Sequence, residues 1–238
     1  MRYSRLDMIH LARIKAITLD LDDTLWPVWP TIERAEQALQ QWLSEHAPAT
    51  AQLCSNAQER MAIRQQVNQH YPEHAHDLSF LRREAIRESL RRAGNATELA
   101  EPAFEVFFSY RHQVTLYDGV AEALQRLSSK YALIALSNGN ADVFKTDAAA
   151  HFKAALSARE VGVAKPDVRI FHAAALQAEV APEEVLHVGD DMTADVFGAL
   201  QAGMQAVWVN REDHAWGHDG PQPLTVRHLS ELCDHLQT

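Results

Sequence analysis

Residues 14–24 read IKAITLDLDDT, in which the apolar run Ile14–Leu19 ends abruptly in acidic residues. The run predicts a short strand. Residues two apart on a strand point the same way, so the side chains of Asp20 and Asp22 can flank one site. A carboxylate can attack phosphorus, and a second carboxyl group nearby can protonate a leaving alkoxide. An acidic turn that only closes a strand is the alternative for these residues taken alone.

Further apolar runs also stop at polar residues. They are Tyr131–Leu136 before Ser137, Val185–Val188 before Gly189 and Asp190, and Ala206–Val209 before Asn210. Runs without strict polar alternation suit strands that are covered on both faces, as in a parallel sheet. Helical patterns occur at Val120–Leu127, Val168–Leu176, Ala194–Leu200 and Val226–Leu236. The alternation predicts an α/β fold, a Rossmann-like parallel sheet flanked by helices, with its ligand site beyond the carboxyl ends of the strands.

The segment between the first strand and the later ones has a different pattern. Residues 26–117 are rich in Gln, Glu, Arg and Ala, and they carry apolar residues at helical spacing, for example Leu78, Leu81, Ile86 and Leu90. This composition favours helices. We therefore expect an inserted α-helical domain over residues 26–117, and a core domain made of residues 1–25 and 118–238.

Polar residues in or after the later runs are candidates for the same site. Ser137 and Asn138 open a Ser-Asn-Gly turn, whose hydroxyl and backbone N–H groups can hold the oxygens of a phosphate group. Lys165 would bring positive charge to a nucleophile and to the transferring phosphoryl group. Taken singly, an ordinary turn and a solvated loop lysine explain these residues. His187 lies inside an apolar run, so we expect a core histidine with a hydrogen-bond partner.

A second acidic cluster follows the third run, with the sequence GDDMTAD over residues 189–195. Magnesium prefers hard oxygen ligands, and Asp190 facing Asp20 would supply them. Without a cation, facing carboxylates would repel one another. Mg²⁺ is therefore the expected cofactor. Asp191 and Asp195 can also cap a helix N-terminus, and for Asp195 both interpretations stay open.

Composition limits the classes of partner. A formal net charge of −10 argues against binding the phosphate backbone of a nucleic acid. Two distant cysteines, Cys54 and Cys233, give neither a disulfide framework nor zinc-ligand spacing. The chain shows no signal-peptide pattern and no run near the ~20 apolar residues of a membrane span. We expect a cytoplasmic protein that binds a small-molecule phosphate ester, with no nucleic-acid or membrane partner; monomer and homodimer both stay open.

Taken in order, the segments DLDDT, LSNG, VAKPD and HVGDDMTAD resemble the phosphatase branch of the haloacid dehalogenase-like hydrolase superfamily. The resemblance covers the core at both ends of the chain. It implies that Asp20 is the nucleophile and a metal ligand, and that Asp22 is a general acid/base whose backbone carbonyl also binds magnesium. Ser137 and Lys165 are implied as phosphate-side residues, and Asp190 as a metal ligand. The helical insertion is implied to be a cap domain of the family's first type.

The resemblance leaves three reactions to weigh. Dehalogenases of the family lack the second carboxyl group, so Asp22 favours a magnesium-dependent phosphomonoester hydrolase with an aspartyl-phosphate intermediate. A phosphomutase keeps both acids, and the pairs Arg82-Arg83 and Arg91-Arg92 are candidates for holding a second phosphate. Solvated helix faces explain these arginines as well. A non-catalytic phospholigand-binding module usually lacks a nucleophile or a metal acid, and neither is missing here.

The same segments are similar to bacterial phosphatases that act in riboflavin metabolism, on flavin mononucleotide or on 5-amino-6-(5-phosphoribitylamino)uracil. Trp26 and Trp29 follow the nucleophile loop directly and are candidates for stacking on a planar ring. Packing at a hinge between the two domains explains them equally well.

Overall fold

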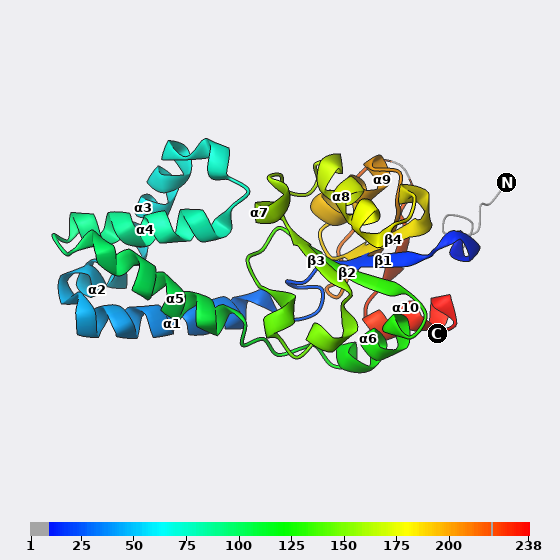
Figure 1. The fold of residues 1–238 in the computed structure, drawn as a ribbon, viewed down its shortest axis with the longest axis horizontal. Helices are drawn as coiled ribbons and strands as arrows, with labels where there is room; N and C mark the ends of the chain where they lie inside the picture. Colours follow the sequence, from blue (N-terminus) through cyan, green and yellow to red (C-terminus); the bar gives the residue numbers. More distant parts are fainter. Residues whose placement is uncertain (1–9, 220) are drawn as a thin grey trace. The chain divides into compact units, whose positions relative to one another are not determined.

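The chain forms two compact units in the computed structural model, which describes residues 10–219 and 221–238 (Figure 1). One unit, called the α/β unit below, consists of the chain up to Pro27 together with Thr115–Thr238. The other, the helical unit, consists of Val28–Val114. The prediction of an α/β fold with a helical insertion after the first strand is confirmed.

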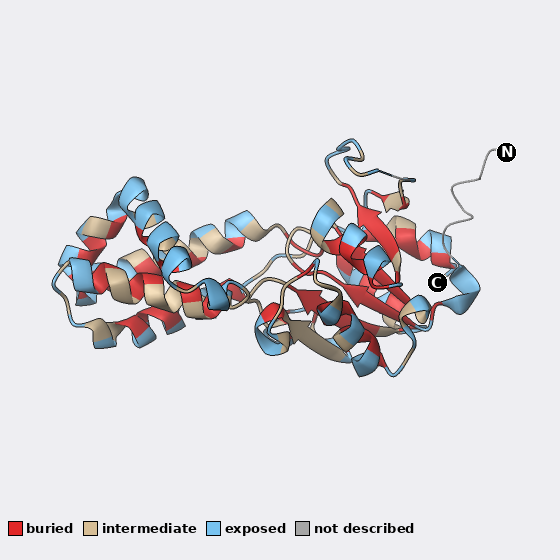
Figure 2. Ribbon diagram, turned by 90° about the horizontal axis from the view of Figure 1, so that it is seen from above, coloured by how far each residue is buried: buried red, intermediate tan, exposed pale blue. Residues whose placement is uncertain are grey.

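Parallel strands form the sheet of the α/β unit, in the order β3-β2-β1-β4-β5-β6. Their bounds are β1 Ala16–Leu19, β2 Ala132–Ser137, β3 Ala154–Ser157, β4 Val185–Gly189, β5 Gln205–Val209 and β6 Leu224–Val226. β1 lies between β2 and β4 and is buried along its whole length (Figure 2). Because every strand runs the same way, the residues that end or follow β1, β2 and β4 meet at one edge of the sheet.

Helices cover both faces of this sheet. The helices of the α/β unit are α6 Val120–Ser128, α7 Ala158–Val161, α8 Val168–Ala178, α9 Gly198–Gln201 and α10 Leu229–Leu236. α8 and α9 lie on one side of the sheet, and α6 and α10 pack together on the other (Figure 1). Phe171 of α8, Ala199 of α9 and Trp208 of β5 are buried in one core cluster. Each large apolar side chain buried there stabilises the fold by about 1.5–3 kcal/mol.

Two strands, β3 and β6, are not among those that the apolar runs predict. They are the outermost strands, short and largely half-buried, so they lack a continuous apolar pattern. The helix predicted over Val226–Leu236 is wrong at its start, because Val226 ends β6 and α10 begins at Leu229. The helix predicted over Ala194–Leu200 starts earlier, as a π-helical turn at Met192–Phe197 that continues into α9.

The helical unit contains α1 Val28–His46, α2 Pro48–Ser55, α3 Ala57–His70, α4 Leu78–Arg92 and α5 Ala100–Arg111. Its main core packs α1 against α4 and α5, with Leu39, Leu90 and Phe104 buried. A smaller cluster around Ile63 and Leu81 joins α3 to α4. These helices therefore bury an apolar interior of their own.

Local side chains fix where several helices start. The Asn56 side chain accepts a hydrogen bond of 2.9 Å from the backbone N–H of Gln58 and caps α3. Asp77 caps α4 by accepting from the N–H of Phe80 over 2.9 Å. Each cap satisfies a backbone donor that the first helical turn would leave without a partner.

The residues at the two junctions belong to the α/β unit. Trp26 is fully buried there, and the backbone N–H of Tyr117 donates to the carbonyl of Leu25 over 2.9 Å. The units therefore divide at Pro27 and Thr115, slightly inside the predicted limits of residues 26 and 117. Within residues 10–219 and 221–238, no helix has the length and apolar character that crossing a membrane requires.

Candidate active site

Asp20 lies at the carboxyl end of β1, in a cluster of polar side chains of the α/β unit. Its backbone N–H donates to the carbonyl of Val188 in β4 over 2.9 Å, which keeps the chain aligned with the sheet up to the acid. Ser137 ends β2 on one side, and Asp190 directly follows β4 on the other. Asp20 and Ser137 are buried, and Ser137 Oγ accepts from the N–H of Gly139 over 2.9 Å. The sheet order thus brings together two acids, Asp20 and Asp190, and the hydroxyl of Ser137, all of which the sequence singles out.

Lys165 places a buried ammonium group between two carboxylates. Its Nζ donates to Asp20 Oδ1 and Asp195 Oδ1, each over 2.6 Å, and to the carbonyl of Leu136 over 2.8 Å. The side chain is 2% exposed, and the three donors of the ammonium match these three acceptors. Burial disfavours a charged lysine, but Asp195 and Asp20 outweigh it and raise the pKa of Lys165. The ammonium group therefore stays charged.

The side chain of Asn138 holds the backbone of Lys165 from both sides. Asn138 Oδ1 accepts from the N–H of Lys165 over 2.7 Å, and Asn138 Nδ2 donates to its carbonyl over 3.0 Å. The turn after β2 thereby fixes the loop that carries the lysine. The sequence predicted Asn138 as a substrate-binding residue, and the structure gives its amide a positioning task. Direct contact of Asn138 with a substrate stays a prediction.

Asp195 completes the cluster from the π-helical turn Met192–Phe197. Its side chain is 2% exposed, and Lys165 and His187 outweigh the effect of burial, so the pKa of Asp195 is lowered. The carboxylate fits because residue 189 is glycine. A Cβ atom added at Gly189 would lie 2.2 Å from Asp195 Cγ. The glycine of the Gly-Asp motif therefore allows the end of β4 and the π-helical turn Met192–Phe197 to approach each other closely.

The structure separates the two acids whose roles the sequence left open. Asp191 is the helix cap, because its Oδ1 accepts from the backbone N–H groups of Thr193 and Ala194, each over 2.7 Å. Asp195 instead points into the polar cluster, and its Oδ2 accepts from the N–H of Asp191 over 3.0 Å. Asp195 is thus a site residue that the capping interpretation would have missed.

His187 in β4 extends the hydrogen-bond network into the core. Its Nε2 lies 3.2 Å from Asp195 Oδ1, and its Nδ1 lies 2.8 Å from Thr18 Oγ1. Burial lowers the pKa of His187, so the ring is neutral near pH 7. Because a carboxylate only accepts, Nε2 carries the proton and the hydroxyl of Thr18 donates to Nδ1. His187 is a core histidine with hydrogen-bond partners, as the sequence indicates.

Asp190 is fixed by its side chain and by its backbone. Thr24 Oγ1 donates to Asp190 Oδ1 over 2.9 Å, and Trp208 Nε1 donates to the Asp190 carbonyl over 2.8 Å. Burial, reinforced by the charge of Asp195, raises the pKa of Asp190 to about 7. Burial also raises the pKa of Asp20 well above its ordinary value, although Lys165 opposes the shift. The cluster is therefore short of positive charge.

That shortage fits a divalent cation. Asp20, Asp190 and Asp195 each offer an oxygen within 4.8 Å of the others. With all three ionised, the single positive charge of Lys165 leaves two negative charges in excess. Lys165 and a backbone N–H already engage both oxygens of Asp195, so we expect Asp20 and Asp190, rather than Asp195, to bind such a cation. The backbone carbonyl of Asp22 as a further ligand stays a prediction.

Asp22 and Trp26 face each other across the tight loop after β1. Trp26 Nε1 donates to Asp22 Oδ1 over 2.9 Å, and the N–H of Asp23 donates to the carbonyl of Trp26 over 2.7 Å. Asp23 has a φ of 57°, which turns the chain back on itself. Because Trp26 is fully buried, it offers no free face for stacking on a ring. Trp29, in the helical unit, is 75% exposed.

Arg211 is a residue of this region that the sequence did not single out. Its Nη2 donates to the carbonyl of Thr24 over 2.6 Å, and its guanidinium lies 4.0 Å from the ring centroid of Tyr117. Arg211 stands just beyond the carboxyl end of β5, so its place at the site edge was readable from the strand pattern. A lone arginine in a polar loop gave no further signal.

The fold and the acidic site are those of an α/β enzyme, and the similarity to the curated phosphatases described below puts the chain in the phosphatase class. The chain belongs to the haloacid dehalogenase-like hydrolase family, whose model matches residues 14–203. The family membership that the motifs indicate is therefore confirmed.

Two curated relatives and one solved structure illustrate the range of the family. The 5-amino-6-(5-phospho-D-ribitylamino)uracil phosphatase YigB of Escherichia coli (strain K12) is 33% identical over 207 residues, covering 85% of this chain and 86% of that protein. The phosphoserine phosphatase of Thermus thermophilus is 41% identical over 160 residues, which is 63% of each chain. The structure of a 2-haloacid dehalogenase from Pseudomonas syringae pv. tomato DC3000 has a TM-score of 0.88 and 38% identity, covering 94% of this chain and 98% of that one.

We expect Gly189→Ala to lower the free energy of unfolding by about 1–3 kcal/mol. The added Cβ would collide with the Asp195 carboxylate, which would have to move away from Lys165. Urea unfolding of both proteins measures the difference. Gly217→Ala is the matched control, because a Cβ atom there would come no closer than 3.7 Å, to Met192. Equal losses in the two variants would contradict the steric explanation.

The raised pKa of Asp190 makes the stability of the metal-free protein depend on pH. With a folded-state pKa of about 7 against an ordinary value of 3.8, the folded protein binds more protons than the unfolded chain between these values. The contribution of Asp190 to the free energy of unfolding therefore falls as pH rises through this window. In chelator, Asp190→Asn should flatten the fall and exceed the wild type near pH 8 by about 1–2 kcal/mol.

Urea unfolding of wild type and Asp190→Asn at several pH values between about 4 and 8 measures this difference. The comparison reports on Asp190 together with its electrostatic coupling to Asp20 and Asp195, because titrating groups remote from the cluster behave alike in both proteins. A difference between the two proteins that stays constant across the window would contradict the assignment of a raised pKa to Asp190.

Proposed function

We propose that this protein is a magnesium-dependent phosphomonoester hydrolase that forms an aspartyl phosphate on Asp20. The observation that carries the proposal is the contact of 2.6 Å between Lys165 Nζ and Asp20 Oδ1, with Asp190 beside it. Lys165 fixes one oxygen of the nucleophile and leaves Oδ2 to approach phosphorus. Its positive charge also reduces the repulsion between the carboxylate and a phosphate dianion.

In the first step, Asp20 Oδ2 forms a bond to phosphorus while the bond from phosphorus to the ester oxygen breaks. Asp22 gives its proton to the leaving alkoxide. Ser137 Oγ and the backbone N–H groups of its turn hold the phosphoryl oxygens. Magnesium, when bound by Asp20, Asp190 and the Asp22 carbonyl, supplies positive charge to the phosphoryl oxygens and favours the ionised acids.

In the second step, water takes the place of the alcohol. Asp22, now ionised, accepts a proton from the water while the water oxygen attacks phosphorus. The bond between phosphorus and Asp20 breaks in the same step. Inorganic phosphate leaves and Asp20 returns to the carboxylate form. Lys165 keeps its charge throughout, because Asp195 stays beside it as a carboxylate even while Asp20 is phosphorylated. One pair of acids therefore serves both halves of the reaction.

In the sequence, the helical unit begins directly after the nucleophile loop and ends before α6. From this place in the sequence we propose that the insertion, predicted over residues 26–117 and folded over Val28–Val114, acts as a cap domain, which governs the access of water and the choice of leaving group. The exposed Trp29 of this segment can contribute a ring contact to a substrate.

For the substrate we propose flavin mononucleotide or the ribitylaminouracil phosphate of riboflavin metabolism. The support is the relative named for the second ester, which is 33% identical over 85% of this chain. The relative named for phosphoserine is 41% identical but covers 63% of the chain. Coverage of most of both chains, cap segment included, favours the first relative as a guide to specificity.

Dehalogenation and phosphate isomerisation are the competing reactions. The similar structure described as a dehalogenase shares 38% of its residues with this chain. Displacement of a halide needs no proton donor, whereas here Trp26 holds Asp22 in place beside the nucleophile loop. Of the arginines considered for a second phosphate, Arg91 and Arg92 pair with Glu88, and Arg82 pairs with Glu36. The retained Asp22 favours hydrolysis over dehalogenation, and the products formed from the esters below separate hydrolysis from isomerisation.

Asp20→Asn should reduce kcat for a generic aryl phosphate in magnesium by roughly 10³-fold or more, because the amide cannot form the covalent intermediate. Removal of magnesium with a chelator should give a comparable loss. Asp191→Asn is the matched control, since asparagine caps a helix as well as aspartate does. Full activity of Asp20→Asn, or hydrolysis that is indifferent to the metal, would exclude the proposed reaction.

A panel of phosphate esters tests the substrate separately from the reaction. We expect kcat/KM for flavin mononucleotide and the ribitylaminouracil phosphate to exceed that for phosphoserine and hexose phosphates by at least tenfold, roughly the effect of one good pocket contact. A clear preference for phosphoserine or a hexose phosphate would overturn the substrate assignment and leave the hydrolase intact. Formation of an isomeric phosphate instead of inorganic phosphate would identify a mutase.

A further inference from the structure

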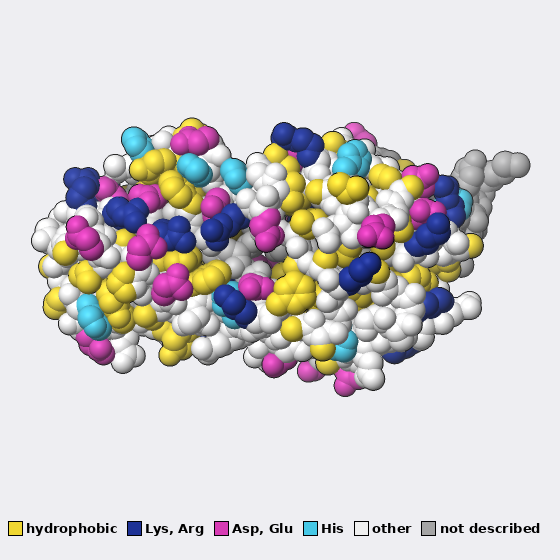
Figure 3. Space-filling model, viewed as in Figure 1, with side chains coloured by type: hydrophobic (Ala, Val, Ile, Leu, Met, Phe, Trp, Pro, Cys, Tyr) yellow, Lys and Arg dark blue, Asp and Glu magenta, His cyan; other side chains and the backbone are white. Residues whose placement is uncertain are grey.

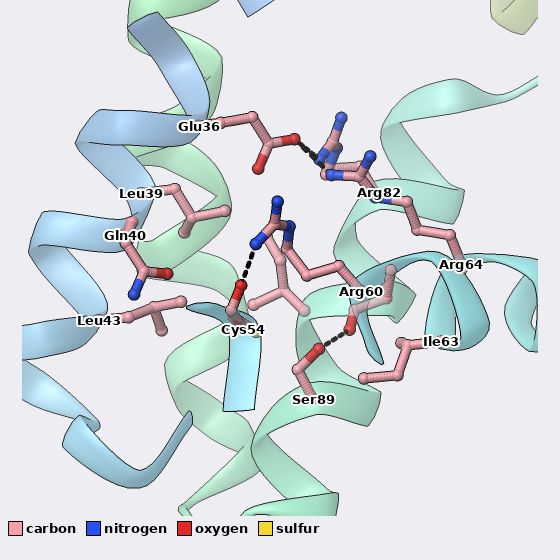
Figure 4. A pocket seen from close by; sticks show the side chains of 12 residues that line it. Glu36, Leu39, Gln40, Leu43, Cys54, Arg60, Ile63, Arg64, Arg82 and Ser89 are labelled. Carbon is pink, nitrogen blue, oxygen red and sulfur yellow. Dashed lines mark hydrogen bonds and ion pairs between the residues drawn. The ribbon is translucent and has the colours of Figure 1, made fainter. Parts of the chain in front are cut away.

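Helices α1, α2, α3 and α4 of the helical unit surround a small pocket that is partly open to solvent, with about 40 Å³ of space for the centres of water molecules (Figure 4). Apolar side chains such as Leu39, Ile63 and Ile86 line one part of it. The polar part holds three arginines and one acid, which are Arg60, Arg64, Arg82 and Glu36. All lining residues belong to the helical unit, so the pocket is separate from the acidic cluster around Asp20.

The charges in this pocket do not balance. Glu36 Oε1 accepts from both Arg64 and Arg82. Burial disfavours its charged form, but Arg82 and Arg64 outweigh burial and lower the pKa of Glu36, so the carboxylate is ionised. Arg60 donates to the backbone carbonyl of Cys54, which carries no charge. Three guanidinium groups against one carboxylate leave two positive charges in excess among the lining residues.

The arginines are held in place around the open volume. The Arg82 side chain is 16% exposed, and its guanidinium lies 4.2 Å from the ring centroid of Phe107. In Figure 4 the guanidinium of Arg60 extends into the middle of the pocket, between Glu36 and Cys54. Basic and acidic side chains are interspersed over the visible face of the helical unit (Figure 3).

The neutral polar groups in the pocket are already engaged. Gln40 Nε2 donates to the carbonyl of Ala51, and Ser89 Oγ donates to the carbonyl of Ala85, each over 2.8 Å. Recognition of a ligand is therefore left to the guanidinium groups. Their planar forks match the oxygens of phosphates and carboxylates, and two excess charges match a dianion.

We propose that this pocket binds the dianionic phosphate group of a small molecule, supplied either as inorganic phosphate or as a phosphorylated metabolite. Arg60 would donate directly to the phosphate oxygens, and Arg64 and Arg82 would bind it beside Glu36. A bound phosphate would link α3 to α4 and to α1, and so stabilise the helical unit. The proposal does not depend on the reaction assigned to Asp20.

Titration of the full-length, metal-free, ¹⁵N-labelled protein with inorganic phosphate tests the site. Amide resonances of the helical unit report on this pocket, whereas those near Asp20 report on the active site. We expect saturable shifts around Arg60 and Arg82. Arg60→Gln should weaken phosphate binding at these resonances by at least about tenfold. Arg91→Gln removes the same charge from α4 at an exposed pair with Glu88 and should change it less than about twofold.

A wild-type titration without saturable shifts in the helical unit would overturn the proposal, as would equal binding by Arg60→Gln. Arg60→Lys keeps the charge but loses the planar fork. It should bind phosphate with intermediate affinity, and it decides the matter where the glutamine variant fails to fold. Glycerol 3-phosphate in a parallel titration separates the sources, because binding of the free ion alone, or of the ester alone, identifies which supplies the phosphate.

Discussion

The buried ammonium group of Lys165, held between Asp20 and Asp195, is the interaction on which the rest of the site depends. At an effective dielectric constant of 20, unit charges at 4 Å attract by about 4 kcal/mol, while each ion loses several kcal/mol of solvation on burial. The arrangement is stable because the ammonium group has one acceptor for each of its three hydrogens, and each acceptor lies within 2.8 Å of Nζ. Any element that places one of these acceptors is therefore under strict geometric constraint.

That constraint explains several residues whose side chains or size position the charged groups. Asn138 holds the backbone of the loop that carries Lys165. Gly189 leaves room for Asp195, and His187 supports the same carboxylate from the core side. The charges that hold the nucleophile in place are thus the charges that stabilise this edge of the sheet. The same packing therefore determines both the reactivity of Asp20 and the stability of this part of the fold.

Much of this architecture could be predicted from the sequence, because the central strands are continuous apolar runs that end at the reactive residues. The edge strands β3 and β6 could not, since half-buried short strands carry no such pattern. The task of Asp195 depends on a π-helical turn and on the space above Gly189, which no local signal encodes. The arginine pocket depends on contacts between α1, α3 and α4, and its residues are far apart in the chain.

The hydrogen bond from the N–H of Tyr117 to the carbonyl of Leu25 closes the base of the insertion within the α/β unit, and Arg211 adds a second link between the two chain crossings. For the sheet, Val28–Val114 is therefore an insertion whose two ends are already fixed, whatever its length and sequence. An ancestral gene could lengthen, shorten or replace that module without disturbing the reactive edge. Such modularity gives natural selection a way to diversify specificity on one chemical scaffold.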